Sequence, residues 1–298
     1  MTTADALRFA YGTNGFGDHR IADALRVLAD LGYDGVSLTL DHQHLDPYAP
    51  DLTARIAQVR TVLETTGLDV VVETGARYLL DPMRKHRPTL VSAHGRSHRV
   101  DLLCRATDIA AELGATTVHL WSGVASDEGV PEEEAWQRLA EGCATVLAHA
   151  SRSGVDLAFE PEPGMLVATL DDYRRLVGLL DGHDRLRLTL DIGHCRCLEP
   201  RSEAECVHRT ADRLAHVQIE DMRRGVHEHL PFGDGEIDFP PVLAALAEVG
   251  YRGLVSVELP RHSHAATVQA RRSIAFLREA AETASASVPE LVKGGPRP

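Results

Sequence analysis

The sequence predicts a single (β/α)8 barrel, in which eight parallel strands alternate with helices around one core. Short apolar, β-branched runs alternate with helical patterns from one end of the 298-residue chain to the other. The count of eight strand–helix pairs is complete within residues 1–283. The alternative, a doubly wound open sheet, is disfavoured because the first strand is not followed by the G-x-G-x-x-G spacing of a dinucleotide-binding turn.

The strands are expected where apolar runs are bounded by turn residues. In chain order they are Leu7–Gly12, Val36–Leu40, Leu68–Glu73, Thr116–Trp121, Val155–Glu160, Leu186–Asp191, Leu214–Glu220 and Leu254–Glu258. The helices are expected where apolar residues recur three and four positions apart, with glycines ending several of them. They are Ile21–Leu31, Leu52–Thr66, Asp101–Leu113, Pro131–Ser153, Leu170–Leu180, Ser202–Ala211, Phe239–Val249 and Ala265–Ala281. Residues 74–100 are expected to form a large loop with short helices, and 284–298 a flexible tail.

Composition limits the partners that this chain can have. Lys and Arg number 31 against 44 Asp and Glu, a net charge of −13 that argues against a nucleic-acid partner. No apolar stretch approaches the ~18 residues of a membrane span, and the polar, acidic start is not typical of a secretory signal. Five scattered cysteines indicate reduced thiols. We therefore expect a cytoplasmic protein with a small-molecule partner, and a homo-oligomer is left open.

Four consecutive strands carry polar side chains at the ends where barrel active sites lie. The fifth strand ends in Glu160, the sixth in Asp191 and the eighth in Glu258, while the seventh carries His216. Buried carboxylates repel one another unless a cation neutralises them. Three carboxylates and one imidazole suit a divalent ion such as Mn²⁺, Mg²⁺, Co²⁺ or Zn²⁺. The sequence therefore predicts a metal site built from these four side chains.

In order and strand placement, Glu160, Asp191-x-x-His194, His216 and Glu258 resemble the xylose isomerase-like barrel superfamily, the sugar phosphate isomerase/epimerase group. The resemblance covers nearly the whole chain. It implies one divalent ion, with Mn²⁺ as the expected metal, and a contact between His194 and substrate oxygens. It also implies that Glu160 and Glu258, besides binding the ion, move protons on opposite faces of the substrate.

The loop of residues 221–239 is longer than the epimerase pattern. Its His227-x-His229 resembles a loop of the endonuclease IV branch, where an Asp-x-His pair binds an extra zinc ion. Because His227 stands where that branch has Asp, a second ion and a contact to substrate are both left open. Further substrate contacts are expected from polar and aromatic residues at other strand ends, namely Glu162, Arg223, Trp121 and His42.

This arrangement suits an isomerase or epimerase acting on a sugar, sugar phosphate or cyclitol-like carbonyl compound. A metal ion lowers the pKa of the C–H bond beside a carbonyl, and a glutamate can then remove that proton. A dehydratase of the inosose type uses the same first step. An endonuclease IV-like hydrolase is a further alternative, although the third strand ends in Glu73-Thr74-Gly75 without the His that it needs. A non-catalytic barrel that binds a metabolite would not need this set of side chains.

Overall fold

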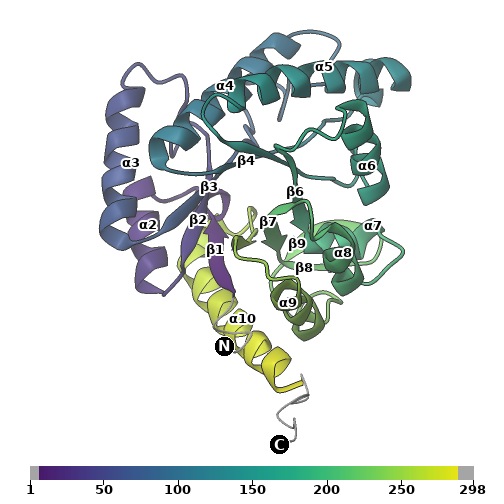
Figure 1. Cartoon of the computed structure of the whole chain (residues 1–298). Helices are drawn as coiled ribbons and strands as arrows, with labels where there is room; N and C mark the ends of the chain where they lie inside the picture. Colours follow the sequence, from purple (N-terminus) through teal and green to yellow (C-terminus); the bar gives the residue numbers. More distant parts are fainter. Residues whose placement is uncertain (1–6, 288–298) are drawn as a thin grey trace, which may run out of the picture.

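The structure, a computed structural model that describes residues 7–287, is a closed barrel of parallel strands surrounded by helices (Figure 1). Strand β1 pairs with both β10 and β2, and this pairing closes the ring. The predicted (β/α)8 fold is thereby confirmed. In order around the ring, the strands are β1 (Arg8–Gly12), β10 (Leu254–Val257), β7 (Leu214–Ile219), β6 (Leu186–Asp191), β5 (Asp156–Phe159), β4 (Thr117–Leu120), β3 (Asp69–Glu73) and β2 (Gly35–Thr39).

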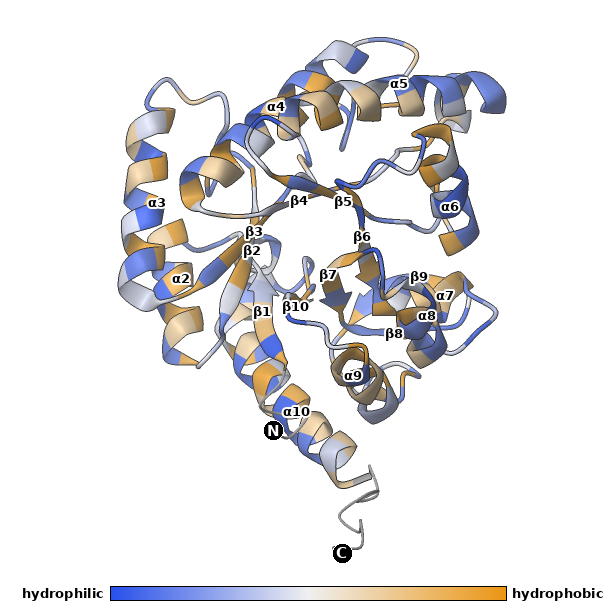
Figure 2. Cartoon of the chain, viewed as in Figure 1, coloured by the Kyte–Doolittle hydropathy of each residue, from blue (hydrophilic) through white to orange (hydrophobic). Residues whose placement is uncertain are grey.

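The helices lie outside the strands and bury the apolar side of each amphipathic segment. They are α2 (Ile21–Asp30), α3 (Leu52–Thr66), α4 (Arg96–Leu113), α5 (Glu132–Ala150), α6 (Leu170–Leu179), α7 (Ile192–Leu198), α8 (Glu203–Thr210), α9 (Phe239–Glu248) and α10 (Ala266–Ser287). Short 3-10 helices occupy Thr13–Phe16, Ser126–Glu128 and Ser263–Ala265. Figure 2 shows mostly hydrophobic strands inside helices of mixed character, as expected for a sheet that is covered on its outer face.

Four segments differ from the sequence-based expectation. Helix α4 begins at Arg96, earlier than predicted, because its polar first turn carries no apolar periodicity. The loop after β7 contains an antiparallel hairpin of β8 (Asp221–Arg223) and β9 (Val226–Leu230). The short helix α7 directly follows β6 and was also not predicted. At the chain end, α10 continues to Ser287, and the rest of the predicted tail lies outside the described residues.

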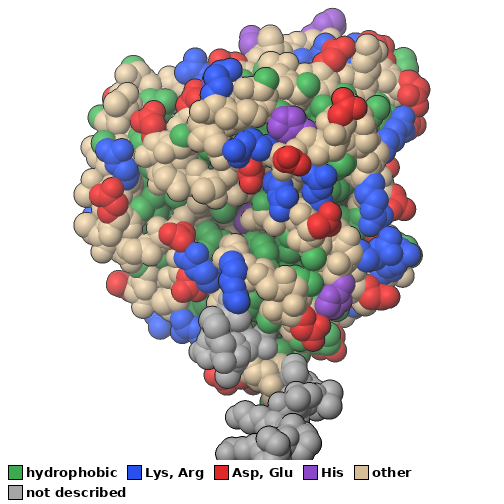
Figure 3. Space-filling model, viewed as in Figure 1, with side chains coloured by type: hydrophobic (Ala, Val, Ile, Leu, Met, Phe, Trp, Pro, Cys, Tyr) green, Lys and Arg blue, Asp and Glu red, His purple; other side chains and the backbone are tan. Residues whose placement is uncertain are grey.

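The surface carries charges of both signs. On the face viewed in Figure 3, acidic and basic side chains are interspersed among other residues. Within residues 7–287, no helix is long and apolar enough to cross a membrane. The cytoplasmic location and the oligomeric state stay predictions.

Close packing of the first strands makes Gly35 a sensitive position. A Cβ atom there would lie 2.6 Å from Leu254 Cδ1 and 2.8 Å from the backbone oxygen of Asp69. We expect Gly35→Ala to lower the free energy of unfolding by about 1–3 kcal/mol in urea titrations, because the backbone oxygen cannot move aside cheaply. The control is Gly178→Ala on α6, where a Cβ would meet no atom within 4 Å and should be neutral or stabilising. Equal stability of the two variants would contradict this account of the strand packing.

Candidate active site

A pocket of about 500 Å³ lies at the carboxyl ends of the barrel strands. Glu160 follows β5 and Glu258 follows β10, and both side chains line this pocket. In the ring, β5 and β10 are separated by β6 and β7 on one side and by four strands on the other. The two glutamates therefore approach the pocket from nearly opposite sides. Glu162, Trp121, His227 and His229 line it too, as the sequence predicted for substrate contacts.

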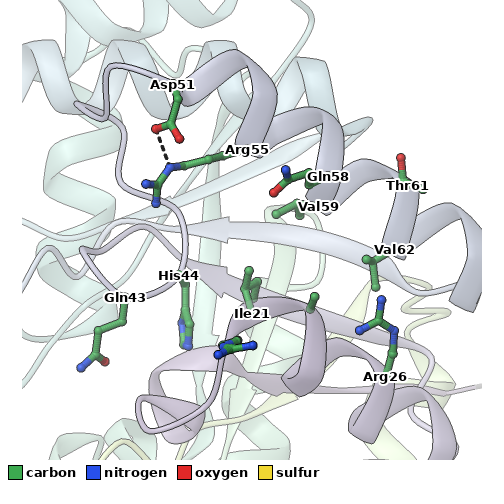
Figure 4. Close-up of a pocket in the computed structure, with 12 residues that line it drawn as sticks. Ile21, Arg26, Gln43, His44, Asp51, Arg55, Gln58, Val59, Thr61 and Val62 are labelled. Carbon is green, nitrogen blue, oxygen red and sulfur yellow. Dashed lines mark hydrogen bonds and ion pairs between the residues drawn. The ribbon is translucent and has the colours of Figure 1, made fainter.

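A second cavity, of about 650 Å³, lies between α2 and α3, away from the strand ends (Figure 4). Its polar side chains are largely paired with one another or with the backbone. Arg55 Nε lies 2.7 Å from Asp51 Oδ1, and His44 Nε2 lies 3.2 Å from the backbone oxygen of Phe16. Asp51 is the only carboxylate in its lining, and none of the possible metal-ligand groups of the described residues lies there, so the strand-end pocket is the candidate active site.

Two overlapping groups of possible metal ligands lie at the strand ends. The first consists of Asp191, Glu220, His229 and Glu258, with one ligand atom of each within 4.8 Å of all the others. The second consists of Glu160, Asp191 and His194 and meets the same limit. Asp191 belongs to both groups. Three of the four predicted ligands therefore lie in one cluster of carboxylates and imidazoles.

Several atoms of this cluster are buried and have no hydrogen-bond partner. They include Asp191 Oδ2, Glu160 Oε1, His229 Nδ1 and both carboxylate oxygens of Glu220. Leaving such atoms unsatisfied costs about 1–3 kcal/mol each, and more when the group is charged. A cation bound among them would remove this cost, so the residues present fit a divalent metal ion.

The electrostatics of the cluster follow from burial and from crowded negative charge. Burial, together with the charges of Glu162 and Glu258, raises the pKa of Glu160 well above its usual range. Burial and the charge of Glu258 likewise raise the pKa of Glu162 to about 7. Burial lowers the pKa of His229, but the carboxylate of Glu220, 3.6 Å from its Nδ1, and the charges of Glu258 and Asp191 outweigh it and raise that pKa to about 10. Positive charge is therefore strongly stabilised here.

His216 does not join either ligand group. It lies inside the barrel, where its Nε2 is 3.1 Å from Ser37 Oγ and 2.9 Å from Ser256 Oγ. Burial lowers its pKa to about 3, so the ring is neutral. Two residues further along β7, Gln218 donates through Nε2 to Glu258 Oε2 at 2.7 Å. The structure thus places a glutamine beside Glu258, and the predicted imidazole one layer below it.

Three other predicted contacts do not line the pocket. His194 lies behind it, with Nε2 3.1 Å from His227 Nε2, and the imidazoles of His194, His227 and His229 form a third group of close ligand atoms. These three imidazoles could hold a second ion, and the binding of that ion stays a prediction. His42 is largely exposed, 3.6 Å from Asp46. Arg223 is exposed as well and donates to the backbone oxygen of Asp234.

Sequence reasoning assigned no role to three residues that the structure places in the site, two of which contact the glutamates. His119 on β4 has its Nε2 within hydrogen-bonding distance of Glu160 Oε2, at 2.6 Å, and burial lowers the pKa of its ring well below 6.5. Asn14 donates to Glu258 Oε1 at 3.0 Å. The third is Glu220, which directly follows β7. It is therefore the residue of this strand that lies at the carboxyl end, where barrel active sites form.

The hairpin that carries His227 and His229 is held by one side chain. Asp221 Oδ2 accepts hydrogen bonds from the backbone N–H groups of Gly233 and Gly235, both at 2.9 Å. Its Oδ1 accepts from the N–H groups of Met222 and Ile237. Because these bonds join both ends of the loop, Asp221 fixes the path along which the two histidines reach the pocket.

Comparison with known proteins identifies relatives over most of the chain. The profile of the xylose isomerase-like TIM barrel family matches residues 25–280. Fructoselysine 3-epimerase of Escherichia coli O157:H7 is 27% identical over 281 residues, covering 91% of this chain and 94% of the relative. Inosose dehydratase of Geobacillus kaustophilus is 27% identical over 265 residues, 82% of each chain. The crystal structure of 3-keto-D-glucoside 4-epimerase from E. coli shares the fold, with a TM-score of 0.74, 20% identity and coverage of 92% and 99%.

Burial of Glu73 leads to a pH-dependent stability. Burial and the charge of Glu258 raise the pKa of Glu73 from 4.5 to about 8 in the folded protein. The carboxyl group of Glu73 binds its proton more tightly in the folded state than in the unfolded state. Its contribution to the free energy of unfolding is therefore complete below pH 4.5 and is lost as the pH rises to 8. Glu73→Gln stays neutral and keeps partners for Thr39 and Gln218.

We therefore expect the advantage of Glu73→Gln over the wild type, measured as the free energy of unfolding in EDTA, to grow by at least about 1 kcal/mol from pH 5 to pH 8. Glu64→Gln on the exposed face of α3 is the control. Parallel pH profiles for wild type and Glu73→Gln would show that Glu73 is ionised in the folded protein.

Proposed function

We propose, since the chain belongs to the xylose isomerase-like TIM barrel family, that it is a metal-dependent isomerase or epimerase of a sugar or a related polyhydroxy carbonyl compound. The observation that carries this proposal is the pair of glutamates, Glu160 and Glu258, that line one pocket from nearly opposite sides beside a cluster of unsatisfied carboxylates. The 3-epimerase relative supports the same reaction class.

The proposed ion site consists of Asp191, Glu220, His229 and Glu258. Glu160 is adjacent to this site, because it shares a second group of close ligand atoms with Asp191. This set keeps two of the predicted ligands in the main group and replaces His216 by His229. Three carboxylates and an imidazole suit Mn²⁺, Mg²⁺, Co²⁺ or Zn²⁺. Such an ion, when bound, polarises a substrate carbonyl and makes the neighbouring C–H bond more acidic.

The glutamates supply the proton transfers. In an epimerase, one carboxylate removes the proton from the carbon beside the carbonyl, and the other, in its acid form, returns a proton to the opposite face. Burial and neighbouring carboxylates raise the pKa of Glu160, which favours its acid form, the form that returns a proton. Aldose–ketose isomerisation would instead use one group on one face.

Neighbouring residues orient these carboxylates. The hydrogen bond from His119 leaves Glu160 Oε1 as the oxygen without a partner, and it is the atom available for a proton. Asn14 and Gln218 donate to separate oxygens of Glu258 and so fix the plane of its carboxylate. Trp121, which lines the pocket, offers an apolar wall to a sugar ring.

A second candidate is a dehydratase, which the match to inosose dehydratase over 82% of both chains favours. It shares proton removal beside a carbonyl and then expels a hydroxide from the next carbon. The two reactions differ in their products, so a single incubation distinguishes them. Mass spectrometry would show loss of water for the dehydratase and unchanged mass for the epimerase.

Replacing either glutamate by glutamine should separate the proton transfers. An amide cannot accept a proton, so we expect Glu160→Gln and Glu258→Gln each to lower net turnover by at least ~10²-fold in a panel of ketoses and keto-cyclitols with Mn²⁺. In a two-base epimerase each variant keeps the base for one face, so one epimer should still exchange its proton with D₂O. A one-base isomerase would lose exchange in one variant only. Near wild-type turnover in both variants, with metal bound, would exclude both residues as bases.

The ligand set is tested by metal affinity rather than by activity. We expect Asp191→Asn and Glu220→Gln to weaken Mn²⁺ binding by at least about tenfold in calorimetric titrations, because each removes one negative charge from the cluster. His216→Gln, whose ring contacts only Ser37 and Ser256 hydroxyls through Nε2, should bind Mn²⁺ like the wild type. Loss of binding in His216→Gln with full binding in Glu220→Gln would restore His216 as the ligand.

A further inference from the structure

Three cationic side chains line the same pocket as the carboxylate cluster. Arg77 and Lys85 lie in the long loop after β3, and Arg261 lies in the loop after β10. Sequence analysis expected a substrate contact from Arg223 in the loop after β7, but Arg223 is not among the lining residues. The basic residues of the pocket thus come from a different part of the barrel mouth.

Arg77 is fixed at this place by the backbone. Its Nη2 donates to the backbone oxygens of Asn14 and Pro260, both at 3.3 Å. These two acceptors follow β1 and β10, so the guanidinium bridges the first and last strands at the mouth. Pro260 directly precedes Arg261, and the same contact therefore brings the Arg77 and Arg261 loops together.

Two of these three cations have no acidic partner, and the third has only a distant one. Within residues 7–287, neither Arg77 nor Lys85 forms an ion pair, and Arg261 reaches Glu228 only at 4.0 Å. Arg84, by contrast, lies next to Lys85 in sequence and pairs with Asp81 at 2.7 Å. In a chain with 44 acidic and 31 basic residues, three cations that line one pocket, two of them without an ion pair, indicate a place for an external anion.

Like charges also make this grouping costly in the absence of an anion. Partial burial and the charges of Arg77 and Arg261 lower the pKa of Lys85, while Glu162 acts in the opposite direction. The carboxylate of Glu162 therefore interacts electrostatically both with Lys85 and with the carboxylates of the cluster. A substrate with an anionic end would be repelled by the carboxylates and attracted by the cations.

We propose that the substrate carries an anionic group, a phosphate or a carboxylate, that Arg77, Lys85 and Arg261 bind while its carbonyl end meets Glu160 and Glu258. This inference rests on the proposed function for the carbonyl end only. Guanidinium and ammonium groups both form charge-assisted hydrogen bonds with either anion. The charge separation within the pocket would then also fix which end of the substrate meets the glutamates.

The test compares matched substrates in the Mn²⁺-loaded enzyme. Solvent-deuterium exchange is measured with D-fructose, D-fructose 6-phosphate and the keto acid 5-keto-D-gluconate, as neutral, phosphate and carboxylate probes. We expect kcat/KM for one anionic probe to exceed that of the neutral sugar by at least about tenfold. Preference for the phosphate or for the acid identifies the anion.

Lys85→Gln and Arg261→Gln should each raise KM for the preferred anionic probe by about tenfold, change kcat by less than about twofold, and leave the neutral sugar unaffected. Arg84→Gln, in the same loop but outside the pocket lining, is the matched control and should behave as wild type. Equal kinetics of neutral and anionic probes, or equal effects of the variants on both, would overturn the anionic substrate and leave the proposed function intact.

A binding measurement separates the two proposals. Calorimetric titration with D-fructose 6-phosphate and 5-keto-D-gluconate reports affinity even if no probe undergoes exchange. Binding that Lys85→Gln weakens about tenfold and Arg84→Gln does not, without exchange of any sugar, would support the anion site and contradict the proposed reaction. Absence of binding of both probes to the wild type, with exchange of the neutral sugar, would reject the anion site alone.

Discussion

The mouth of this barrel is organised by one constraint, which is that several carboxylates are forced close together out of water. Four of them, Glu73, Glu160, Asp191 and Glu220, are buried, and Glu162 and Glu258 are partly covered beside them. Negative charges at such short range raise one another's pKa values and call for positive charge. Without a bound ion, protons on the carboxyl groups and on His229 supply it, whereas a divalent ion would displace the proton of His229 and satisfy the oxygens that no hydrogen bond reaches.

The fold was predictable because each strand buries a short apolar run and each helix a periodic one. The strand-end rule also located Glu160, Asp191 and Glu258 correctly at one mouth, since parallel strands place their carboxyl ends together. The same rule, applied strictly to β7, indicates Glu220 rather than His216. His216 lies four residues before Glu220, and side chains at that spacing share a face but lie about 13 Å apart along the strand, so His216 belongs to a deeper layer.

What the sequence could not supply is the path of the loop after β7. The motif His227-x-His229 predicts two imidazole groups in this loop, but it does not predict where the hairpin places them relative to the pocket. That position depends on Asp221, whose carboxylate collects backbone N–H groups from residues up to sixteen positions away. It depends as well on Gly193 at the start of α7, where a Cβ would lie 2.0 Å from Glu220 Oε1. Residue 193 must be a glycine because of a contact with a residue 27 positions away, and the sequence around Gly193 does not indicate this contact.

The resulting pocket has an electrostatic direction. Carboxylates gather where β3, β5, β6, β7 and β10 end, whereas the cations lie further along the loops that follow β3 and β10. A neutral sugar would gain little from this separation, because hydroxyl groups are nearly alike at every carbon. A substrate with one charged end would be bound in a single orientation before any proton moves. Proton transfer beside a carbonyl requires that the reacting carbon lie between the two glutamates. By fixing the orientation of such a substrate, the charge separation would select the carbon that reacts as well as the substrate that binds.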